Sequence, residues 1–599
     1  MTTIDQITDK IIERSRDSRA EYLSMIAEMR YAPPAPDRLS CSNWAHVVAA
    51  ESEEDKKGIP SGQGANIGIV TAYNDMLSAH QPFANYPNII KLTARSLGAT
   101  AQVAGGVPAM CDGVTQGQPG MELSLFSRDV IAMATAVSLS HDVYDAVMCL
   151  GVCDKIAPGM VIGSLQFGHL PVIFVPAGPM PSGIPNKEKA AARQKFATGE
   201  IDKATLLETE SASYHSAGTC TFYGTANTNQ ALLEALGLQL AGTSFVNPGT
   251  LLRTELTKAS VTQILDQSPK GNNYTPMAEV VTEKSIVNAI VMMMATGGST
   301  NLTLHLIAMA AAAGIQINWD DMDEISRITP LLAKVYPNGQ ADVNHFEQAG
   351  GLAFLVTQLR TLGLLNEDVK NVMGEGLDAY TRKPQIDEQR NLTWGDPVVK
   401  NGDPDILASA QNPFATEGGM RKVTGNLGTG VVKISAVDKK YQIIEAPCVI
   451  FESQEALKNA FEAGDLDRDH IAVVRFQGPA ANGMPELHKL TPYLGILQDR
   501  GFRVALVTDG RMSGASGKVL TAMHVSPEAK LGGVLAKVEN GDIIQLNCDT
   551  GQLSLLVSDD ELEARSAAKQ PQTSSSLGRG LFKNMRSAVG VSTKGASSI

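Results

Sequence analysis

A thiol, a carboxylate and an amine are adjacent at Cys153, Asp154 and Lys155. They follow the apolar run 146–150, which predicts a buried parallel strand, and they precede an apolar stretch that can open a helix. In open α/β sheets, ligands bind outside the carboxyl ends of the strands. Thiolates suit soft metals and carboxylates suit hard ones, so this turn could serve either kind of metal. A buried cysteine beside a surface salt bridge explains the same three residues, so the metal hypothesis needs partners elsewhere.

Two further loops carry a cysteine of this kind. Cys111 and Asp112 lie in the loop 105–117, which contains several glycines and a proline and falls between a predicted strand and a predicted helix. Small and hydroxylated residues surround Cys220, so the backbone there could approach a bulky ligand. As a magnesium ligand, Asp112 would pair with Asp154; the alternatives are a helix cap at Asp112 and an ordinary turn at Cys220. The remaining cysteines are interpreted as core or structural residues: Cys41, Cys149, Cys448 and Cys548.

Three stretches in the second half of the chain could act on a substrate. The Gly-Gly-Ser-Thr-Asn turn 297–301 precedes an apolar helix and offers N–H groups to an anion, although a simple helix cap explains it equally well. Glu486 follows a turn, and the loop 508–518 follows a buried strand. A long loop so rich in glycine and hydroxyl groups is more often functional, and Ser513 within it could approach a bound substrate closely. The sequence has no CxxC pair and no phosphate-binding GxxxxGK[ST] motif.

The composition restricts the class of protein. With 599 residues the chain is too long for a single core, so two or more domains are expected. Its net charge of −13 disfavours a nucleic-acid partner, which would need a basic surface. No apolar run approaches the roughly 20 residues that cross a bilayer, and the first residues lack the pattern of a signal peptide. We therefore expect a cytoplasmic protein that acts on a small molecule and binds no membrane.

Short apolar runs alternate with helical patterns in the first half of the chain. This alternation predicts an α/β fold with a doubly wound parallel sheet and many helices. Residues 1–60 show a partial helical stripe and predict an arm that packs on another surface, such as a second subunit. Residues 180–365 are expected to be mostly helical. The predicted strands of the sheet are 67–71, 101–103, 146–150 and 171–175.

The pattern changes after about residue 375. The polar stretch 381–413 contains four prolines and predicts a linker, and short β-like runs with glycine turns follow it. They predict a mainly β, barrel-like second domain. We expect an α/β domain over 1–385, a barrel-like domain over 386–573 and a loosely held tail over 574–599. The predicted strands of the second domain are 431–434, 472–476, 504–507, 543–546 and 553–557.

Taken together, these stretches resemble the dihydroxy-acid/phosphogluconate dehydratase family over nearly the whole chain. Many long motifs occur in the same order, which makes chance agreement implausible. The stretches shared with the family as a whole are 153–155, the Cys220 loop, 297–301, 483–486 and 508–511. The stretches similar to its phosphogluconate branch are 73–82, 107–117, 219–224 and 484–490.

The resemblance implies a homodimeric hydro-lyase that converts 6-phospho-D-gluconate to 2-dehydro-3-deoxy-6-phospho-D-gluconate, with an iron–sulfur cluster as Lewis acid. In the family pattern, Cys153 and Cys220 match cluster ligands, and Ser513 matches the base that takes the C2 proton. Lys155 matches a lysine that can be carbamylated and so become an oxygen ligand. The positions that hold magnesium match Asp112, Asp154 and Glu486. By motif position alone, substrate contacts are expected from His80, Ser299, Thr300, Arg511 and Lys518, with His488 and Lys489 as further candidates for the phosphate.

One departure concerns the third cluster cysteine, which many members carry in the segment matching 74–81. Here that position is Ala79, followed by His80. Either the cluster has a non-cysteine or open position, or Cys111 takes the place. Members with three cysteines have a 2Fe–2S cluster, whereas the phosphogluconate branch is assigned 4Fe–4S, which is the type we expect. The alternatives are a dehydratase of another sugar acid or of a branched dihydroxy acid, and a non-catalytic iron–sulfur protein, which would have no use for the acidic residues.

Overall fold

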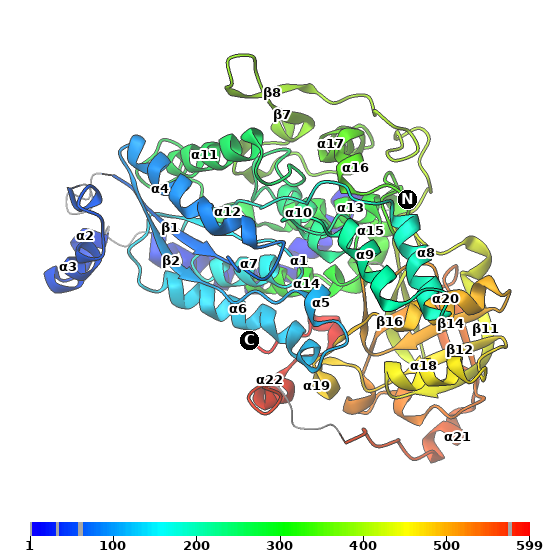
Figure 1. The fold of residues 1–599 in the computed structure, drawn as a ribbon. Helices are drawn as coiled ribbons and strands as arrows, with labels where there is room; N and C mark the ends of the chain where they lie inside the picture. Colours follow the sequence, from blue (N-terminus) through cyan, green and yellow to red (C-terminus); the bar gives the residue numbers. More distant parts are fainter. Residues whose placement is uncertain (1–2, 31–34, 58–63, 515, 573–577) are drawn as a thin grey trace.

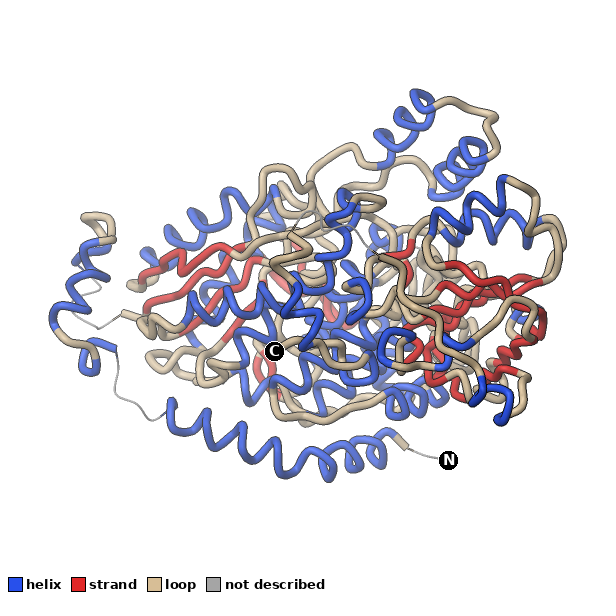
Figure 2. Tube along the Cα trace, turned by 90° about the horizontal axis from the view of Figure 1, so that it is seen from below, coloured by secondary structure: helices blue, strands red, loops and turns tan. Residues whose placement is uncertain are grey.

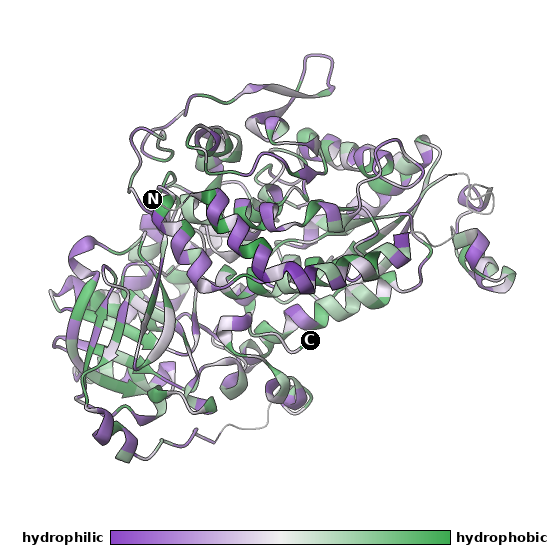
Figure 3. Cartoon of the chain, turned by 180° about the vertical axis from the view of Figure 1, so that it is seen from behind, coloured by the Kyte–Doolittle hydropathy of each residue, from purple (hydrophilic) through white to green (hydrophobic). Residues whose placement is uncertain are grey.

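The computed structural model describes residues 3–30, 35–57, 64–514, 516–572 and 578–599. A helix-rich part built on a parallel sheet is followed by a closed β-barrel (Figure 1). Apolar residues line the barrel strands, while hydrophilic residues gather on the surrounding helices and loops (Figure 3). Within the described ranges, no helix combines the length and the apolar character that a membrane crossing needs.

The N-terminal sheet has four parallel strands in the order β2-β1-β3-β4, which confirms the predicted α/β architecture. Every residue of β3 is buried, as expected for a parallel strand covered by helices on both faces. Because β2 and β3 flank β1, the loops that follow them emerge side by side at one edge of the sheet. The strands are β1 (Asn66–Thr71), β2 (Thr100–Gly106), β3 (Ala146–Leu150) and β4 (Val172–Phe174).

Two helices that follow these strands pack at backbone distance. Helix α7 (Ile156–Leu165) is entirely buried and lies against α6 (Ser124–Leu139). A Cβ added to Gly159 would lie 2.5 Å from the carbonyl oxygen of Arg128, and one on Gly163 would lie 2.4 Å from that of Ala132. Glycine at these positions therefore lets α7, which begins directly after Lys155, sit tightly on the core.

The remaining helices surround this core or fill the space between the sheet and the barrel. Helices α13 and α14 are almost wholly buried, and α10 is buried along most of its length. The main helices are α4 (Tyr86–Ser96), α5 (Asp112–Thr115), α8 (Asn186–Ala197), α9 (Lys203–Ser213), α10 (Thr225–Ala235), α11 (Leu251–Asp266), α12 (Met277–Val280), α13 (Glu283–Thr296), α14 (Leu302–Ala312), α15 (Trp319–Ile328), α16 (Val343–Gln348) and α17 (Gly351–Thr361).

The N-terminal arm packs on its own chain. Helix α1 (Ile4–Arg30) runs along one side of the molecule and contacts α13 and α15 (Figure 2). The buried guanidinium of Arg19 donates hydrogen bonds to the carbonyl oxygens of Ala278, Val281 and Ala313, at 2.7–2.9 Å. The N-terminal arm was predicted to pack on another surface, such as a second subunit. In the structure, that surface belongs to the same chain. Two short helices follow in the arm, α2 (Ala35–Arg38) and α3 (Cys41–Ala49).

The C-terminal part is a closed eight-stranded barrel in the order β10-β16-β14-β12-β11-β17-β18-β9, so the barrel-like prediction is confirmed. The segment predicted as a linker instead forms a hairpin of β7 (Arg382–Ile386) and β8 (Leu392–Pro397), which packs on α11 and α17. The barrel strands are β9 (Met420–Gly425), β10 (Gly428–Lys433), β11 (Ile443–Phe451), β12 (His470–Val474), β14 (Val504–Thr508), β16 (Leu520–Ser526), β17 (Ile543–Asn547) and β18 (Gln552–Leu555). Helices α18 (Gln454–Glu462), α19 (Pro479–Asn482), α20 (Leu490–Asp499) and α21 (Asp559–Ala564) accompany them.

The last described residues are held firmly, which differs from the expected loose tail. After α22 (Lys583–Ala588), the chain returns to the helix-rich part. The carbonyl oxygens of Gly595 and Ala596 accept hydrogen bonds from the fully buried guanidinium of Arg128, at 2.9 Å each. The side chain of Asp129 accepts the backbone N–H of Ser598 at 2.7 Å. A buried arginine needs acceptors, and this segment supplies them.

Candidate metal and active site

The candidate site lies where the sheet edge meets the barrel. Asp112 opens α5 after β2, and Asp154 follows β3. From the barrel side come two short parallel strands, β13 (Glu486–Leu487) and β15 (Arg511–Met512), in which Glu486 pairs with Arg511. The two parts of the chain thus contribute complementary groups to one buried region.

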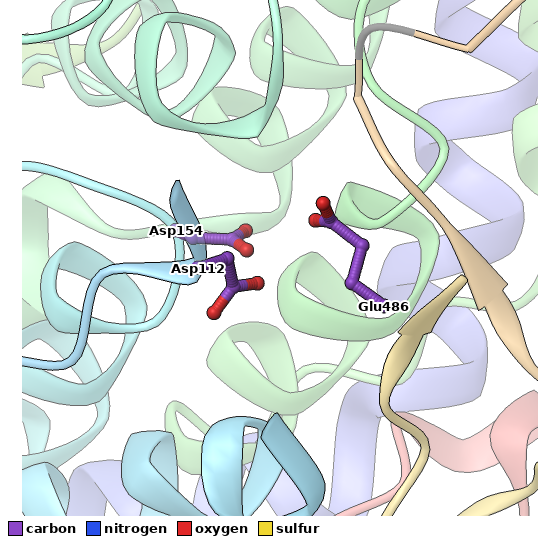
Figure 4. A group of neighbouring side chains, drawn as sticks. All are labelled: Asp112, Asp154 and Glu486. Atoms are coloured by element: carbon purple, nitrogen blue, oxygen red, sulfur yellow. The ribbon is translucent and has the colours of Figure 1, made fainter. Parts of the chain in front are cut away.

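Three carboxylates converge in this region. Oxygens of Asp112, Asp154 and Glu486 lie within 4.8 Å of one another, and all three side chains are buried (Figure 4). The Nζ of Lys155 lies 2.5 Å from Oδ2 of Asp112 and 2.5 Å from Oδ2 of Asp154. Carboxylates so close together repel one another, so they need cations or protons among them.

Arg511 is the second cation of the group and is fully buried. It donates to Oδ2 of Asp112 at 2.9 Å and lies 3.5 Å from Asp154 and 3.4 Å from Glu486. Burial alone would raise the pKa of Asp112, but the charges of Lys155 and Arg511 hold it well below its usual range. Burial and the charge of Asp112 raise the pKa of Glu486 to about 7. Burial also raises the pKa of Asp154, against the opposing charge of Lys155. Among three carboxylates facing two cations, Glu486 and Asp154 are therefore the two whose protonated forms are favoured.

Three thiols lie close to this cluster. Cys153 adopts φ 73°, a left-handed conformation that turns the chain sharply after β3. Burial raises the pKa of Cys111, and burial followed by the neighbouring thiol of Cys111 raises that of Cys220 to about 12. Burial raises the pKa of Cys153 well above its usual range, and the Cys111 and Cys220 thiols raise it further. The three sulfur groups are therefore close enough to oppose one another's ionisation.

Helix α10 fixes two of the three cysteine turns. The side-chain amide of Asn229 donates to the carbonyl oxygens of Cys153, at 3.2 Å, and Asp154, at 3.0 Å. The amide of Asn227 donates to the carbonyl oxygen of Cys220 at 2.6 Å. Both asparagines are buried, so these backbone contacts fix the turns without occupying the sulfur atoms.

The loop that carries Ser513 reaches the site from the barrel. Ser513 follows β15 and is half-buried, and its carbonyl oxygen accepts the backbone N–H of Ser516 at 2.9 Å. A Cβ added to Gly514 would lie 2.8 Å from the Cα of Gly224, four residues after Cys220. Glycine at both positions lets the serine loop touch the loop of a cluster-ligand candidate.

The turn 297–301 also joins the two parts of the chain. The hydroxyl of Ser299 lies 2.8 Å from that of Thr225, and Asn301 donates to the same threonine at 3.1 Å. Thr300 donates to the sulfur of Met523 in the barrel, at 3.0 Å. These groups are buried and hydrogen-bonded to other residues of the protein. In this structure the turn therefore connects α10 with the barrel.

Two predicted substrate residues lie in different surroundings. His80 is fully buried, and burial lowers its pKa to about 4, so its ring is neutral at physiological pH. Lys518 is exposed and forms an ion pair with Asp499, at the end of α20. The structure therefore brings Arg511 to the carboxylates and turns Lys518 toward a surface helix.

Two neutral side chains that the sequence analysis missed also contact the carboxylates. The hydroxyl of Ser124 donates to Oδ1 of Asp112 at 2.5 Å, and Nε2 of Gln116 donates to Oε1 of Glu486 at 2.8 Å. Gln116 belongs to the loop already singled out, so its proximity to Asp112 was a usable signal. Ser124 opens a helix of ordinary composition and gave none.

His305 is a further residue that the sequence analysis missed. Its Nε2 lies 3.8 Å from Oδ1 of Asp154, and its Nδ1 lies 3.3 Å from Nη1 of Arg128. Arg128 is the residue that binds the carbonyl oxygens of Gly595 and Ala596. A continuous series of contacts therefore links the last residues of the chain to the acidic cluster.

The donors suit two different metals. Hard carboxylate oxygens are the ligands that Mg²⁺ prefers, and Asp112, Asp154 and Glu486 present them together. Thiolates suit iron–sulfur clusters. The cysteines have no disulfide partners among the described residues, so the three thiols near the site remain available as ligands.

Comparison with known proteins gives a consistent family. Residues 65–380 match the family model described as dihydroxy-acid/6-phosphogluconate dehydratase N-terminal, and residues 405–596 match the corresponding C-terminal model. The chain is 57% identical to a phosphogluconate dehydratase of Pseudomonas aeruginosa, covering 99% of this chain and 98% of the relative. It is 54% identical to the enzyme of that name from Escherichia coli K12, covering 99% of each. A dihydroxy-acid dehydratase of Lachnoclostridium phytofermentans is 34% identical over 84% of this chain and 88% of the relative.

Proposed function

The chain belongs to the dihydroxy-acid/6-phosphogluconate dehydratase family, and from this membership we propose that it is a hydro-lyase of the Entner–Doudoroff pathway. It converts 6-phospho-D-gluconate to 2-dehydro-3-deoxy-6-phospho-D-gluconate and water. The observation that carries this choice is the identity of 57% over almost the full length with a relative named phosphogluconate dehydratase, against 34% over a shorter span for a dihydroxy-acid dehydratase. We further propose that it acts as a homodimer in the cytoplasm.

The proposed cofactors are Mg²⁺ and a 4Fe–4S cluster. Asp112, Asp154 and Glu486 would hold Mg²⁺, and a carbamylated Lys155 would add an oxygen ligand where its ammonium now lies. The thiols of Cys153 and Cys220, with Cys111 as third ligand, would hold the cluster. When bound, the cluster supplies a Lewis acid for the departing C3 hydroxyl, and Mg²⁺ stabilises negative charge on the substrate carboxylate.

The protein's own part in the reaction begins with proton transfer at C2. That proton is weakly acidic because it lies beside a carboxylate, so the base must be strong and well placed. We assign this role to Oγ of Ser513, on a loop pressed against the Cys220 loop. A serine hydroxyl is a base only when nearby cations lower its pKa, and the buried guanidinium of Arg511 lies two residues away in the chain.

The buried cations have a second role. Before any metal binds, Lys155 and Arg511 hold Asp112 and Asp154 in place through short contacts; once Lys155 is carbamylated, Arg511 remains as the cation beside both carboxylates. The site lies between the sheet edge and the barrel, where bulk water has little access and charges interact more strongly. After C3 loses its hydroxyl, the enol product leaves and tautomerises to the 2-keto acid.

One anaerobic experiment tests the proposal. The protein is reconstituted with iron, sulfide and Mg²⁺, its iron and sulfide are quantified, and turnover is measured with 6-phosphogluconate, gluconate and 2,3-dihydroxyisovalerate. We expect clear preference for 6-phosphogluconate and about four irons per chain. Preference for either other acid would identify a different dehydratase, and a loaded cluster without any turnover would support a non-catalytic iron–sulfur protein.

A further inference from the structure

The substrate of the proposed reaction carries a phosphate at C6, and the acidic cluster has no free cation to bind it. Arg511 is engaged with three carboxylates, and Lys518 forms an ion pair with Asp499. A phosphate needs cations or N–H donors that the protein does not already neutralise. The phosphate therefore requires basic residues near the thiols that have no obligatory partner.

Helix α8 offers one such residue, Lys189, and one turn away a second cation, Arg193, which is paired with Glu210. Lys189 and Arg193 are four positions apart and so share a face of the helix. Lys189 is 5% exposed, and its Nζ lies 3.5 Å from the hydroxyl of Tyr214 and 4.7 Å above its ring. Among the described residues it forms no ion pair, so this lysine brings an unneutralised charge into a buried place. Burial and then the charge of Arg193 lower its pKa.

Arg193 is oriented by an acidic neighbour. Glu210 on α9 binds its guanidinium through two hydrogen bonds, from Nε and from Nη2, the latter at 2.9 Å. These contacts fix the plane of the guanidinium, which also lies beside the side chain of Tyr214. Because a guanidinium has five N–H groups, donors remain for a further acceptor. The side chain of Arg193 is about half exposed, at 48%, as expected for the entrance of a binding site.

Two basic residues face this helix from the barrel side. His488 and Lys489 follow the metal-ligand candidate Glu486 by two and three positions. A Cβ on Gly117 would lie 3.4 Å from Cε of Lys489 and 3.7 Å from Cε1 of His488, so both residues lie against the loop that holds Asp112. Both residues directly precede α20, which begins at Leu490.

Contacts place the basic residues of both parts of the chain beside the loops of the site. The Nζ of Lys189 lies 3.5 Å from the hydroxyl of Tyr214, which precedes Cys220 by six residues. His488 and Lys489 lie against Gly117, in the loop that carries Cys111 and Asp112. Basic residues from both parts of the chain therefore border loops that carry candidate ligands.

We propose that Lys189, Arg193, His488 and Lys489 form the subsite that binds the C6 phosphate of the substrate. The inference rests on the proposed function, in which C1 and C2 lie at the acidic cluster and C3 at the thiols. The phosphate lies on the opposite side of C3 from the carboxylate, so it should extend past the thiols, and Lys189 is the buried cation beside them. A phosphate dianion would give Lys189 the counter-charge that it lacks.

The test compares Lys189→Met with Lys187→Met in the full, reconstituted protein. Lys187 lies on the same helix but is exposed, so it controls for loss of a positive charge on α8. For Lys189→Met we expect KM for 6-phosphogluconate to rise roughly 10- to 100-fold, with a smaller change in kcat, because one charged hydrogen bond to the phosphate is lost. The preference for 6-phosphogluconate over gluconate should fall by at least about tenfold. The Lys187 variant should match the wild type in both quantities.

Two additional measurements keep the test decisive. Lys189→Arg retains the charge and should recover part of the lost preference, whereas damage to folding would not be repaired in this way. Inorganic phosphate should inhibit the wild type competitively and the Lys189→Met variant at least about tenfold more weakly. An unchanged preference in a folded, cluster-loaded Lys189→Met protein would overturn the subsite while leaving the dehydratase function intact. A wild type that does not prefer 6-phosphogluconate would instead overturn the proposed function.

Discussion

The carboxylates of the acidic cluster are buried and the thiols are buried or half-buried, yet the two groups hold charge in opposite ways. The carboxylates of Asp112 and Asp154 already contact the ammonium of Lys155 and the guanidinium of Arg511. No such ion pair serves the described thiols, and burial raises the pKa of each thiol near the site. One half of the site is thus charged before any metal arrives, whereas the other stays neutral.

This difference predicts different chemistry of assembly. Thiols ligate metals as thiolates, so loading the sulfur half must release protons, and the metal itself must lower the thiol pKa values. Loading the oxygen half releases protons only from the carboxylates whose pKa is raised, Glu486 and Asp154, but the ammonium of Lys155 must move or lose its charge. Carbamylation would remove the positive charge of Lys155. The side chain would then bind the metal, with which its ammonium now competes for the carboxylates.

Removing a sulfur ligand should have the largest effect. Cys153→Ser replaces a thiol that lies between the two halves of the site, so we expect iron content and visible absorbance to collapse after reconstitution. Turnover should fall at least about 1,000-fold, because a Lewis acid contributes several kcal/mol to such a step. Cys149→Ser, four residues earlier inside β3, is the matched control and should keep its iron. Full iron content in Cys153→Ser would remove this residue from the cluster.

Removing the base should uncouple chemistry from assembly. Ser513→Ala should retain the cluster spectrum and the bound Mg²⁺, yet lose roughly 100- to 10,000-fold in kcat, as expected when a general base is deleted. Ser516→Ala lies in the same loop, three residues later, and should keep most of its activity. Near-normal turnover by Ser513→Ala would assign proton abstraction to another group.

The two halves also differ in how far the sequence could reveal them. Cys153, Asp154 and Ser513 lie in loops shortly after strands, and Asp112 opens the short helix α5 after β2. Apolar runs and glycines mark these strand ends in the sequence. The sequence could therefore predict that these residues converge. The sequence could not decide whether Cys111 is the third cluster ligand or whether that position of the cluster stays open. The answer depends on how close three loops come in space.

Residues inside helices escaped prediction for a physical reason. Ser124, Lys189 and His305 occupy helices whose patterns are satisfied by packing, and nothing local distinguishes a side chain that faces a site. Lys518 shows the opposite error. Its glycine-rich loop predicted a substrate contact, but its side chain forms an ion pair with Asp499. The fold was predictable where strands are continuous apolar runs, but the β7–β8 hairpin was missed because prolines and charged residues interrupt its pattern.

A pH titration would sharpen the contrast between the two halves. Glu486 has a pKa of about 7, so below that pH a proton competes with the metal for its carboxylate. With Mn²⁺ as a paramagnetic probe, we expect affinity to fall by up to about tenfold per pH unit below pH 7. Glu486→Gln should bind Mn²⁺ at least about tenfold more weakly at pH 8 and show a flatter pH dependence. An equally steep dependence in the variant would assign the titration to another group.

The smallest predicted effect comes from a residue that touches a ligand and not the metal. Burial and then the charge of Arg128 lower the pKa of His305 well below its usual value, so the ring is neutral. Arginine can only donate, so Nδ1 of His305 must accept and Nε2 must carry the proton toward Oδ1 of Asp154, 3.8 Å away. This distance is too long for a hydrogen bond, and neither atom has a hydrogen-bond partner among the described residues. We predict that the N–H orients the carboxylate when a metal binds it, and losing such a contact typically weakens metal affinity about tenfold.

His305→Leu removes this donor and His305→Gln can restore an N–H near the position of Nε2. We expect Mn²⁺ affinity to fall about tenfold in the first variant and to recover partly in the second, with the iron content of both unchanged. Met309→Leu, a buried substitution on the same helix, controls for altered packing and should keep wild-type affinity. Because His305 contacts the oxygen half alone, a loss of iron in His305→Leu would mean that the two halves of the site are mechanically coupled and do not assemble independently.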